Sequence, residues 1–329
     1  MRSQPNLQLL NYAFFMRAYF TRRLIGAVPL LIGIAVISFL FMQAMPGGPT
    51  AMLARNSRMS KEQLENVKRS LGLDQPVPVQ LAKWLVNSAR GDFGLSFTSF
   101  RPVTEVIGER VGPTLRLMAV AVIGALVLAL GAGLLSALYR YSFVDNVVTA
   151  VSFIGLAMPV FWIGLMLQLF FAVQLGWLPA ADMTTNKGAL DDARHLILPA
   201  FTLAFGTVAS WSRYVRSSML ETMNLDYIRT ARAKGVNEWG TITRHALRNA
   251  LIPFVTVVAI DIPFFLAGAV VTETIFSWPG LGRLFFDALR ARDYPVLMGI
   301  LVYSAVLIVA FGIVADLIYA ALNPRIRYR

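Results

Sequence analysis

Long uninterrupted apolar stretches, which do not alternate with polar positions, dominate the pattern of this chain. Residues with charged side chains are missing from 24–54, 117–139, 146–181, 195–212 and 294–315. A further stretch, 249–272, contains a single charge, that of Asp261. Because a helix needs about 20 apolar residues to cross a bilayer, the pattern predicts six membrane-spanning helices. We place them at 24–45, 115–138, 148–174, 196–217, 252–275 and 296–320.

The expected fold is therefore an all-α polytopic membrane protein. A soluble core would need several uncharged helices longer than those of ordinary globular proteins. A cleaved signal peptide would have a shorter apolar run than the one that begins at Leu24. Composition agrees, since 57% of the residues are hydrophobic and 15% are charged, whereas about a quarter of the residues in soluble domains are charged.

The segments outside the first span divide the chain further. Residues 1–23 combine aromatic and arginine side chains, which suits either a helix in the membrane interface or a simple flank of the first span. Residues 46–114 form the largest aqueous segment, for which we expect a small folded cap with helices at 60–71 and 79–88. Residues 115–320 hold the other five spans.

The net charge of +12 is distributed unevenly along the chain. Fifteen Lys and Arg fall in the segments on one side of the predicted membrane, and five fall in the short segments on the other side. These segments are 1–23, 139–147, 212–251 and 321–329 on the first side, and 175–195 and 276–295 on the second. The long 46–114 segment on the second side carries nine more, but loops of that length cross the membrane largely regardless of charge. Lys and Arg favour the cytoplasmic side, so both termini, including the tail 321–329, are expected there. We interpret the positive charge as an orientation signal next to membrane lipid, with no nucleic acid as partner.

Residues with catalytic or metal-binding chemistry are scarce. The chain has no cysteine, and its two histidines, His195 and His245, lie far apart, so the sequence predicts no metal site. Neither of the glycine-rich patterns that cradle phosphates, G-x-x-x-x-G-K-[ST] and G-x-G-x-x-G, occurs. We therefore expect no enzyme activity and no cofactor in this chain.

A basic loop, 218–251, separates the fourth and fifth predicted spans. Ala, Arg and Lys favour a helix over 228–234, and Gly235 is expected to end it. A second helix is expected from about Glu238 into the fifth span. Two short helices that meet at a glycine predict a compact, rigid knob, which can transmit motion.

Several segments resemble one family of proteins. In chain order they are Gly91-Asp-Phe-Gly-Leu-Ser96, Asp226-Tyr-Ile-Arg-Thr-Ala-Arg-Ala-Lys-Gly235, Glu273-Thr-Ile-Phe-Ser-Trp-Pro-Gly-Leu-Gly282 and Arg292-Asp-Tyr-Pro295. They resemble the permease subunits of dipeptide and oligopeptide ABC importers, and the likeness extends over nearly the whole chain. The 46–114 segment makes the first permease of the pair the better match.

The basic loop is similar to the cytoplasmic "EAA" loop of ABC importer permeases, although only part of that pattern is kept. Ala231, Gly235 and Leu247 agree with it. The positions that depart from it are Arg229, Thr230, His245 and Arg248.

The resemblance implies a type I ABC importer permease in the bacterial inner membrane, which forms half of a pore. It implies a second homologous permease subunit, two cytoplasmic subunits that bind ATP and Mg, and an extracytoplasmic solute-binding protein. It also implies that the basic loop docks on an ATPase. The docking residues would be Asp226, Tyr227, Arg229, Thr230, Ala231, Arg232, Ala233, Lys234 and Gly235.

The resemblance makes a peptide the expected substrate, with dipeptides first. Nickel, glutathione or another small solute on the same architecture is the alternative. An ion-coupled secondary carrier is the alternative from another class. Such a carrier would need several acidic residues within the membrane, and we find one deep carboxylate, that of Asp261.

Asp261, Glu273 and Trp278 are the candidate residues of the substrate path. A charge in mid-span is costly unless it is paired, so Asp261 either faces the pore and meets a cationic amine or makes a hydrogen bond to a neighbouring helix. We favour the pore. Glu273 either lines the gate or fixes the turn before Trp278.

Overall fold

The computed structural model describes residues 5–44, 62, 65, 69, 73–183 and 189–322. These residues are mainly helical, and the extended pairing among them is an isolated antiparallel bridge between Leu95 and Pro102. The chain forms two compact units. Unit 1 comprises Met1–Glu109, Phe285–Ile313 and Arg325–Arg329, and unit 2 comprises Arg110–Leu284 and Val314–Pro324.

Among the residues that the structure describes, five helices are long and apolar enough to cross a membrane. They are α1 (Pro5–Ala44), α5 (Val103–Leu138), α8 (Ala189–Met223), α11 (Arg248–Ile275) and α13 (Tyr294–Leu322). The first, second, fourth, fifth and sixth predicted spans fall on these helices, which confirms that apolar run length located them.

The third span differs from the prediction of one continuous helix at 148–174. It is a pair of helices, α6 (Phe143–Ala157) and α7 (Val160–Leu167), followed by a π-helical stretch, η1 (Gln168–Gln174). The two parts are bent by 111°. Pro159 causes the break because it offers no amide hydrogen and forces the residue before it out of the helical region. Both Met158 and Pro159 have extended backbones, with ψ of 134° and 136°.

Unit 1 contains α1 and α4 (Val77–Ala89). Helix α1 is continuous over 40 residues, so the expected 6–23 segment and the first span are one element. Helix α4 confirms the helix expected at 79–88. The helix expected at 60–71 lies outside the described residues except for 62, 65 and 69, which are helical.

Helix α4 packs on the end of α1 through polar and aromatic contacts. The rings of Phe39 and Trp84 are 6.1 Å apart between centroids, and the Gln43 side chain donates to that of Gln80 at 2.9 Å. Helix α5 begins at Val103, so the last residues of the 46–114 segment already belong to this long helix.

The loop between α4 and α5 is anchored by a buried carboxylate. Asp293, which is 1% exposed, accepts hydrogen bonds from the hydroxyls of Ser96 and Thr98 at 2.5 and 2.6 Å and from the amide of Phe97 at 3.0 Å. This arrangement gives a structural reason for the Gly-Asp-Phe-Gly-Leu-Ser and Arg-Asp-Tyr-Pro segments. The first segment ends with the donor Ser96, with Phe97 and Thr98 directly after it, and the second supplies the acceptor Asp293.

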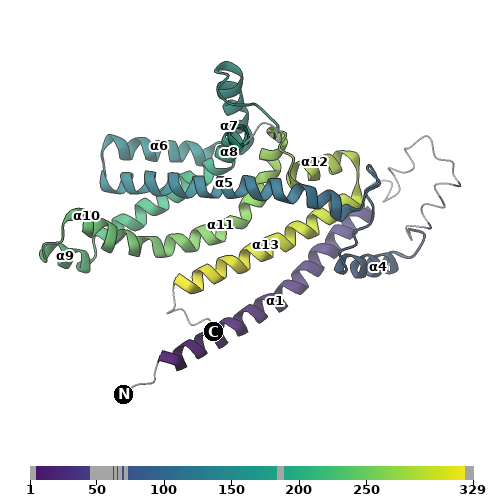
Figure 1. Cartoon of the computed structure of the whole chain (residues 1–329), viewed down its shortest axis with the longest axis horizontal. Helices are drawn as coiled ribbons and strands as arrows, with labels where there is room; N and C mark the ends of the chain where they lie inside the picture. The colour runs from purple at the N-terminus through teal and green to yellow at the C-terminus, as the bar shows by residue number, and fades with distance from the viewer. Residues whose placement is uncertain are drawn as a thin grey trace. The chain divides into compact units, whose positions relative to one another are not determined.

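Unit 2 contains most of α5 together with α6, α7, α8 and α11. Helix α8 packs against α6, α7 and α11. The connection from α8 to α11 consists of α9 (Asp226–Ala233), α10 (Glu238–Gly240) and the π-helical η2 (Thr241–Leu247). In Figure 1 this connection lies at the end of unit 2 where α5 turns back into α6.

Candidate functional site

Helix α9 presents one face inward and the other outward. Ile228 is fully buried and Ala231 is 8% exposed, and Met219 of α8 and Ala246 of η2 are also fully buried. Asp226 lies in the first turn and Arg232 in the last, so both charges have the sign that the helix dipole favours. These side chains explain why so short a helix is stable here.

Gly235 ends α9 as expected. Its φ is +79°, a conformation that glycine adopts without steric cost. The amide of Gly235 donates to the carbonyl of Arg232 at 3.0 Å, and the amide of Val236 donates to the carbonyl of Ala231 at 3.2 Å. These two bonds form a Schellman motif, which satisfies the last carbonyls of a helix. The prediction that a glycine separates two short helices is confirmed.

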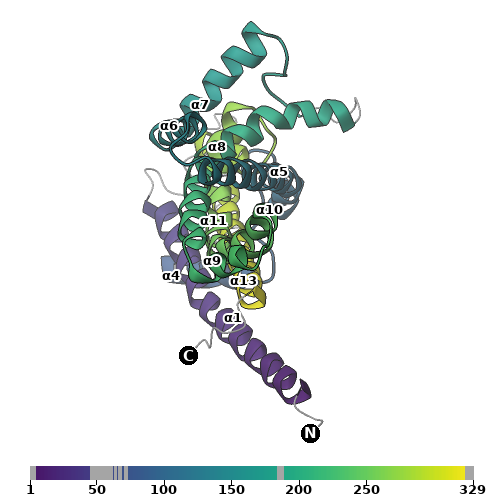
Figure 2. The ribbon, with the colours of Figure 1, turned by 90° about the vertical axis from the view of Figure 1, so that its left-hand side faces the viewer.

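One side-chain contact caps α10 and another joins it to α9. The Asn237 side chain accepts from the amide of Gly240 at 2.7 Å, which caps α10. The Arg232 guanidinium donates to both carboxylate oxygens of Glu238, at 3.1 and 2.6 Å. The hydrogen bond to Glu238 raises the pKa of Arg232, so the guanidinium stays charged. Figure 2 shows α9 and α10 side by side.

The two stems of the loop are also tied together. The Ser218 hydroxyl of α8 donates to the carbonyl of Ala250 in α11 at 2.9 Å. The Asn249 amide donates to the Tyr227 hydroxyl at 3.1 Å. Hydrogen bonds thus join α8, α9, α10 and α11, and they form the compact knob that the sequence predicts.

Eight of the nine predicted docking residues are exposed. They are Asp226, Tyr227, Arg229, Thr230, Arg232, Ala233, Lys234 and Gly235. The ninth, Ala231, is buried and therefore supports the knob from inside. Sequence reasoning missed Trp239, which is 67% exposed. The signal was present, because a large aromatic residue stands four positions after the helix-ending glycine.

Asp261 lies in the middle of α11 and is partly buried. One of its carboxylate oxygens accepts from the indole nitrogen of Trp211 in α8 at 2.8 Å, and Trp211 is fully buried. A hydrogen bond between helices is therefore present at this residue. It uses one oxygen, and part of the side chain remains exposed, so a pore-facing role stays a prediction.

Glu273 and Trp278 are fully buried. The Glu273 carboxylate accepts from the Thr114 hydroxyl and from the amide of Gly282, both at 2.6 Å. The Trp278 indole donates to the carbonyl of Pro113 at 3.0 Å. These contacts hold the turn after α11 against α5. In this conformation neither side chain has surface open to a solute, and a role in the substrate path stays a prediction.

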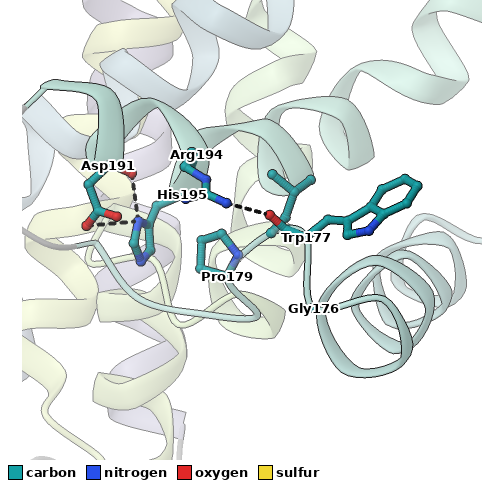
Figure 3. A pocket seen from close by; sticks show the side chains of 7 residues that line it. Gly176, Trp177, Pro179, Asp191, Arg194 and His195 are labelled. Atoms are coloured by element: carbon teal, nitrogen blue, oxygen red, sulfur yellow. Dashed lines mark hydrogen bonds and ion pairs between the residues drawn. The ribbon is translucent and has the colours of Figure 1, made fainter.

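A hollow of about 330 Å³ lies between η1 and the start of α8 (Figure 3). Arg194 donates to the carbonyl of Trp177 at 2.9 Å, and Nδ1 of His195 lies 2.8 Å from the carbonyl of Asp191. Both side chains thus contact backbone carbonyls around this turn. The part of the chain that the structure describes contains no cluster of three or more potential metal ligands.

Two protein families match this chain, and together their matches cover most of it. Residues 129–328 match a family described as binding-protein-dependent transport system inner membrane component. Residues 16–118 match the N-terminal family of the same kind of membrane component. Together the two matches include the knob and most of the membrane helices.

Individual relatives span the full length. The oligopeptide transport system permease protein AppB of Bacillus subtilis is 46% identical over 317 residues, which cover 95% of this chain and 100% of AppB. The glutathione transport system permease protein GsiC of Escherichia coli K12 is 38% identical over 314 residues, with the same coverage of 95% and 100%.

A chain of the inward-facing MetNI methionine ABC transporter has a similar fold. The TM-score is 0.55 at 19% identity, over 66% of this chain and 96% of that chain. The likeness supports the all-α polytopic architecture expected from the sequence.

Proposed function

Because this chain belongs to the family of binding-protein-dependent transport system inner membrane components, we propose that it forms half of the pore of an ATP-driven peptide importer. The family places it in the bacterial inner membrane as a multi-pass permease subunit. Dipeptides are the first substrates to test.

The similar relatives support peptides as the substrate class. One is named for oligopeptides and the other for glutathione, which is itself a tripeptide. Nickel shares no such chemistry with these two solutes and is less favoured. An ion-coupled carrier is less favoured too, because the relatives are permease proteins of transport systems.

The knob supports coupling to an ATPase. Its exposed face carries two aromatic side chains, Tyr227 and Trp239, near the cations Arg229 and Lys234. Aromatic residues and arginine contribute most of the binding energy in protein interfaces. The partners in this proposal are a second homologous permease, two cytoplasmic subunits that bind ATP and Mg, and an extracytoplasmic solute-binding protein. ATP hydrolysis belongs to the partner subunits.

In this mechanism, ATP-driven closure of the ATPases displaces the knob. The displacement switches the pore between inward-open and outward-open states. Since ATP binds to another subunit, it can act only through contacts that differ between the two states. The hydrogen bonds across α8, α9, α10 and α11 make the knob stiff enough to pass such a displacement on.

The single observation that carries the proposal is the full-length relation to two peptide permeases. Uptake of labelled di-, tri- and pentapeptides and of nickel, in cells with and without this gene, tests it. Loss of peptide uptake alone supports the proposal. Unchanged peptide uptake with lost nickel uptake would keep the architecture and overturn the substrate.

A further inference from the structure

Asp145, the third residue of α6, accepts four hydrogen bonds from three residues of unit 2. It is 3% exposed. One carboxylate oxygen accepts from the Ser136 hydroxyl at 2.5 Å and from Nε of Arg216 at 2.7 Å. The other accepts from the amide of Tyr141 at 2.9 Å and from a second guanidinium nitrogen of Arg216 at 2.8 Å.

This cluster joins three helices. Ser136 lies near the end of α5, Tyr141 lies in the turn after it, and Asp145 lies in the first turn of α6, whereas Arg216 comes from α8. The two bonds from Arg216 form a bidentate pair, which fixes orientation as well as distance. Removal of one partner would leave a buried charge without compensation. We call this cluster the Asp145 clamp.

Close backbone contacts support the clamp along the same helices. A Cβ atom added to Gly133 of α5 would lie 2.6 Å from the carbonyl oxygen of Ser212 in α8, and one added to Gly155 of α6 would lie 2.9 Å from Cβ of Ala209. The hydroxyls of Ser152 in α6 and Ser212 are 3.2 Å apart. Small residues let membrane helices approach this closely. Such contacts resist sliding of α8 past the α5–α6 hairpin.

The Asp145 clamp lies beside the knob. Arg216 is seven residues before Met223, where α8 ends, and α9 begins at Asp226. Figure 1 shows the α5–α6 turn and α9 with α10 at the same end of unit 2. A displacement of the knob therefore reaches Arg216 before it reaches the residues of α8 that precede Arg216.

We propose that Asp145 and Arg216 are coupling residues, which lock α8 to the α5–α6 hairpin so that a push on the knob moves the three helices as one body. This inference rests on the proposed function, because it requires the knob to receive the motion of an ATPase. The clamp then decides how much of that motion reaches the second span and the first half of the third.

An ion pair between α5 and α8 provides a matched control. Arg116 lies 3.2 Å from Asp192, with side chains 41% and 23% exposed. Asp192 lies near the start of α8 and Arg216 near its end, so this pair is remote from the knob. The pair is less buried than Asp145 and Arg216 and has one hydrogen bond in place of a bidentate pair, so we expect it to contribute less.

The first experiment compares the wild-type complex, Asp145→Asn and Asp192→Asn in proteoliposomes with the solute-binding protein. We expect Asp145→Asn to raise the number of ATP molecules hydrolysed per peptide transported about tenfold, within the usual range of coupling energies. The ratio for Asp192→Asn is expected to stay within about twofold of wild type. A purely structural role would lower hydrolysis and transport together, and an unchanged ratio in Asp145→Asn would overturn the proposal.

A second experiment decides the question even if Asp145→Asn fails to assemble. Ser152→Cys with Ser212→Cys places two thiols across α6 and α8, and the chain has no other cysteine. If α6 and α8 move as one body, the oxidised variant transports peptide within about twofold of the reduced one, because a disulfide adds no constraint that the native contacts lack. Loss of transport on oxidation, reversed by a reductant, would show that the helices slide and would overturn the proposal.

The two proposals fail in different ways. If no ATPase co-purifies with the wild-type chain, the proposed function is overturned, and the role of the clamp with it. If the wild-type complex couples hydrolysis to uptake and the Asp145→Asn complex couples equally well, the clamp alone is overturned.

Discussion

At the scale of single residues, Gly235 is required by its backbone conformation and not by crowding. A Cβ atom at this position would meet nothing within 4 Å, but φ is +79°. We expect Gly235→Val to strain the end of α9 by roughly 1–2 kcal/mol and to abolish peptide uptake, because the exposed face of the knob would be distorted. Gly235→Asn is the control, since Asn tolerates this conformation. Uptake by Gly235→Val at the wild-type rate would contradict this explanation.

Asp261 offers a test in which structure and charge are separated. Asp261→Asn keeps an oxygen that accepts from the Trp211 indole and removes only the negative charge. We expect normal assembly and a lower uptake of peptides with a free amino terminus. The reason is that the ammonium group of the peptide would lose the carboxylate that pairs with it. Uptake of N-acetylated peptides serves as the control. Equal effects on both classes would leave Asp261 with the helix-to-helix role alone.

At the scale of elements, the turn between α11 and α12 (Leu281–Ala291) is built around a buried carboxylate. The amide of Gly282 donates to Glu273, and that of Leu281 donates to Thr114 at 2.8 Å. A Cβ atom at Gly280 would lie within 2.4 Å of both Glu273 oxygens, so no larger side chain fits without displacing that group.

We therefore expect Gly280→Ala to destabilise the protein by about 1–3 kcal/mol, read as a lower midpoint of thermal unfolding in detergent. Gly131→Ala in α5 is the matched control, because a Cβ atom there meets nothing within 4 Å. Equal midpoints for the two variants would contradict the account of this turn.

Five spans and the knob were predictable because each depends on local sequence. Apolar run length fixes the spans, and the knob follows from helix propensity and one glycine. The break at Pro159 was not predictable, because proline in a membrane helix often bends the helix without breaking it. The apolar run has the same length whether the helix is bent or broken. The Asp145 clamp was also out of reach, since Asp145 and Arg216 are 71 residues apart and no local pattern pairs them.

At the scale of the whole molecule, the charge distribution predicts which side of the membrane each segment occupies. The chain has no cysteine, so single cysteines can report it. Thr230→Cys in the knob and Lys83→Cys in α4 both replace exposed residues. We expect an impermeant thiol reagent to label Lys83→Cys from outside intact spheroplasts and Thr230→Cys only after lysis. The opposite pattern would reverse the orientation and place the knob away from any cytoplasmic ATPase.

The bend in the third span has a consequence for the lipid around this subunit. The first amide groups of a helix have no carbonyl ahead of them to accept their hydrogens, and α7 starts at Val160, inside an apolar stretch, with Val160 and Phe161 exposed in the isolated chain. Hydrocarbon offers no acceptors. Where this bend meets the bilayer, water or another protein chain must therefore cover the amides of Val160 and Phe161, whereas those of Trp162 and Ile163 already donate to the carbonyl of Pro159.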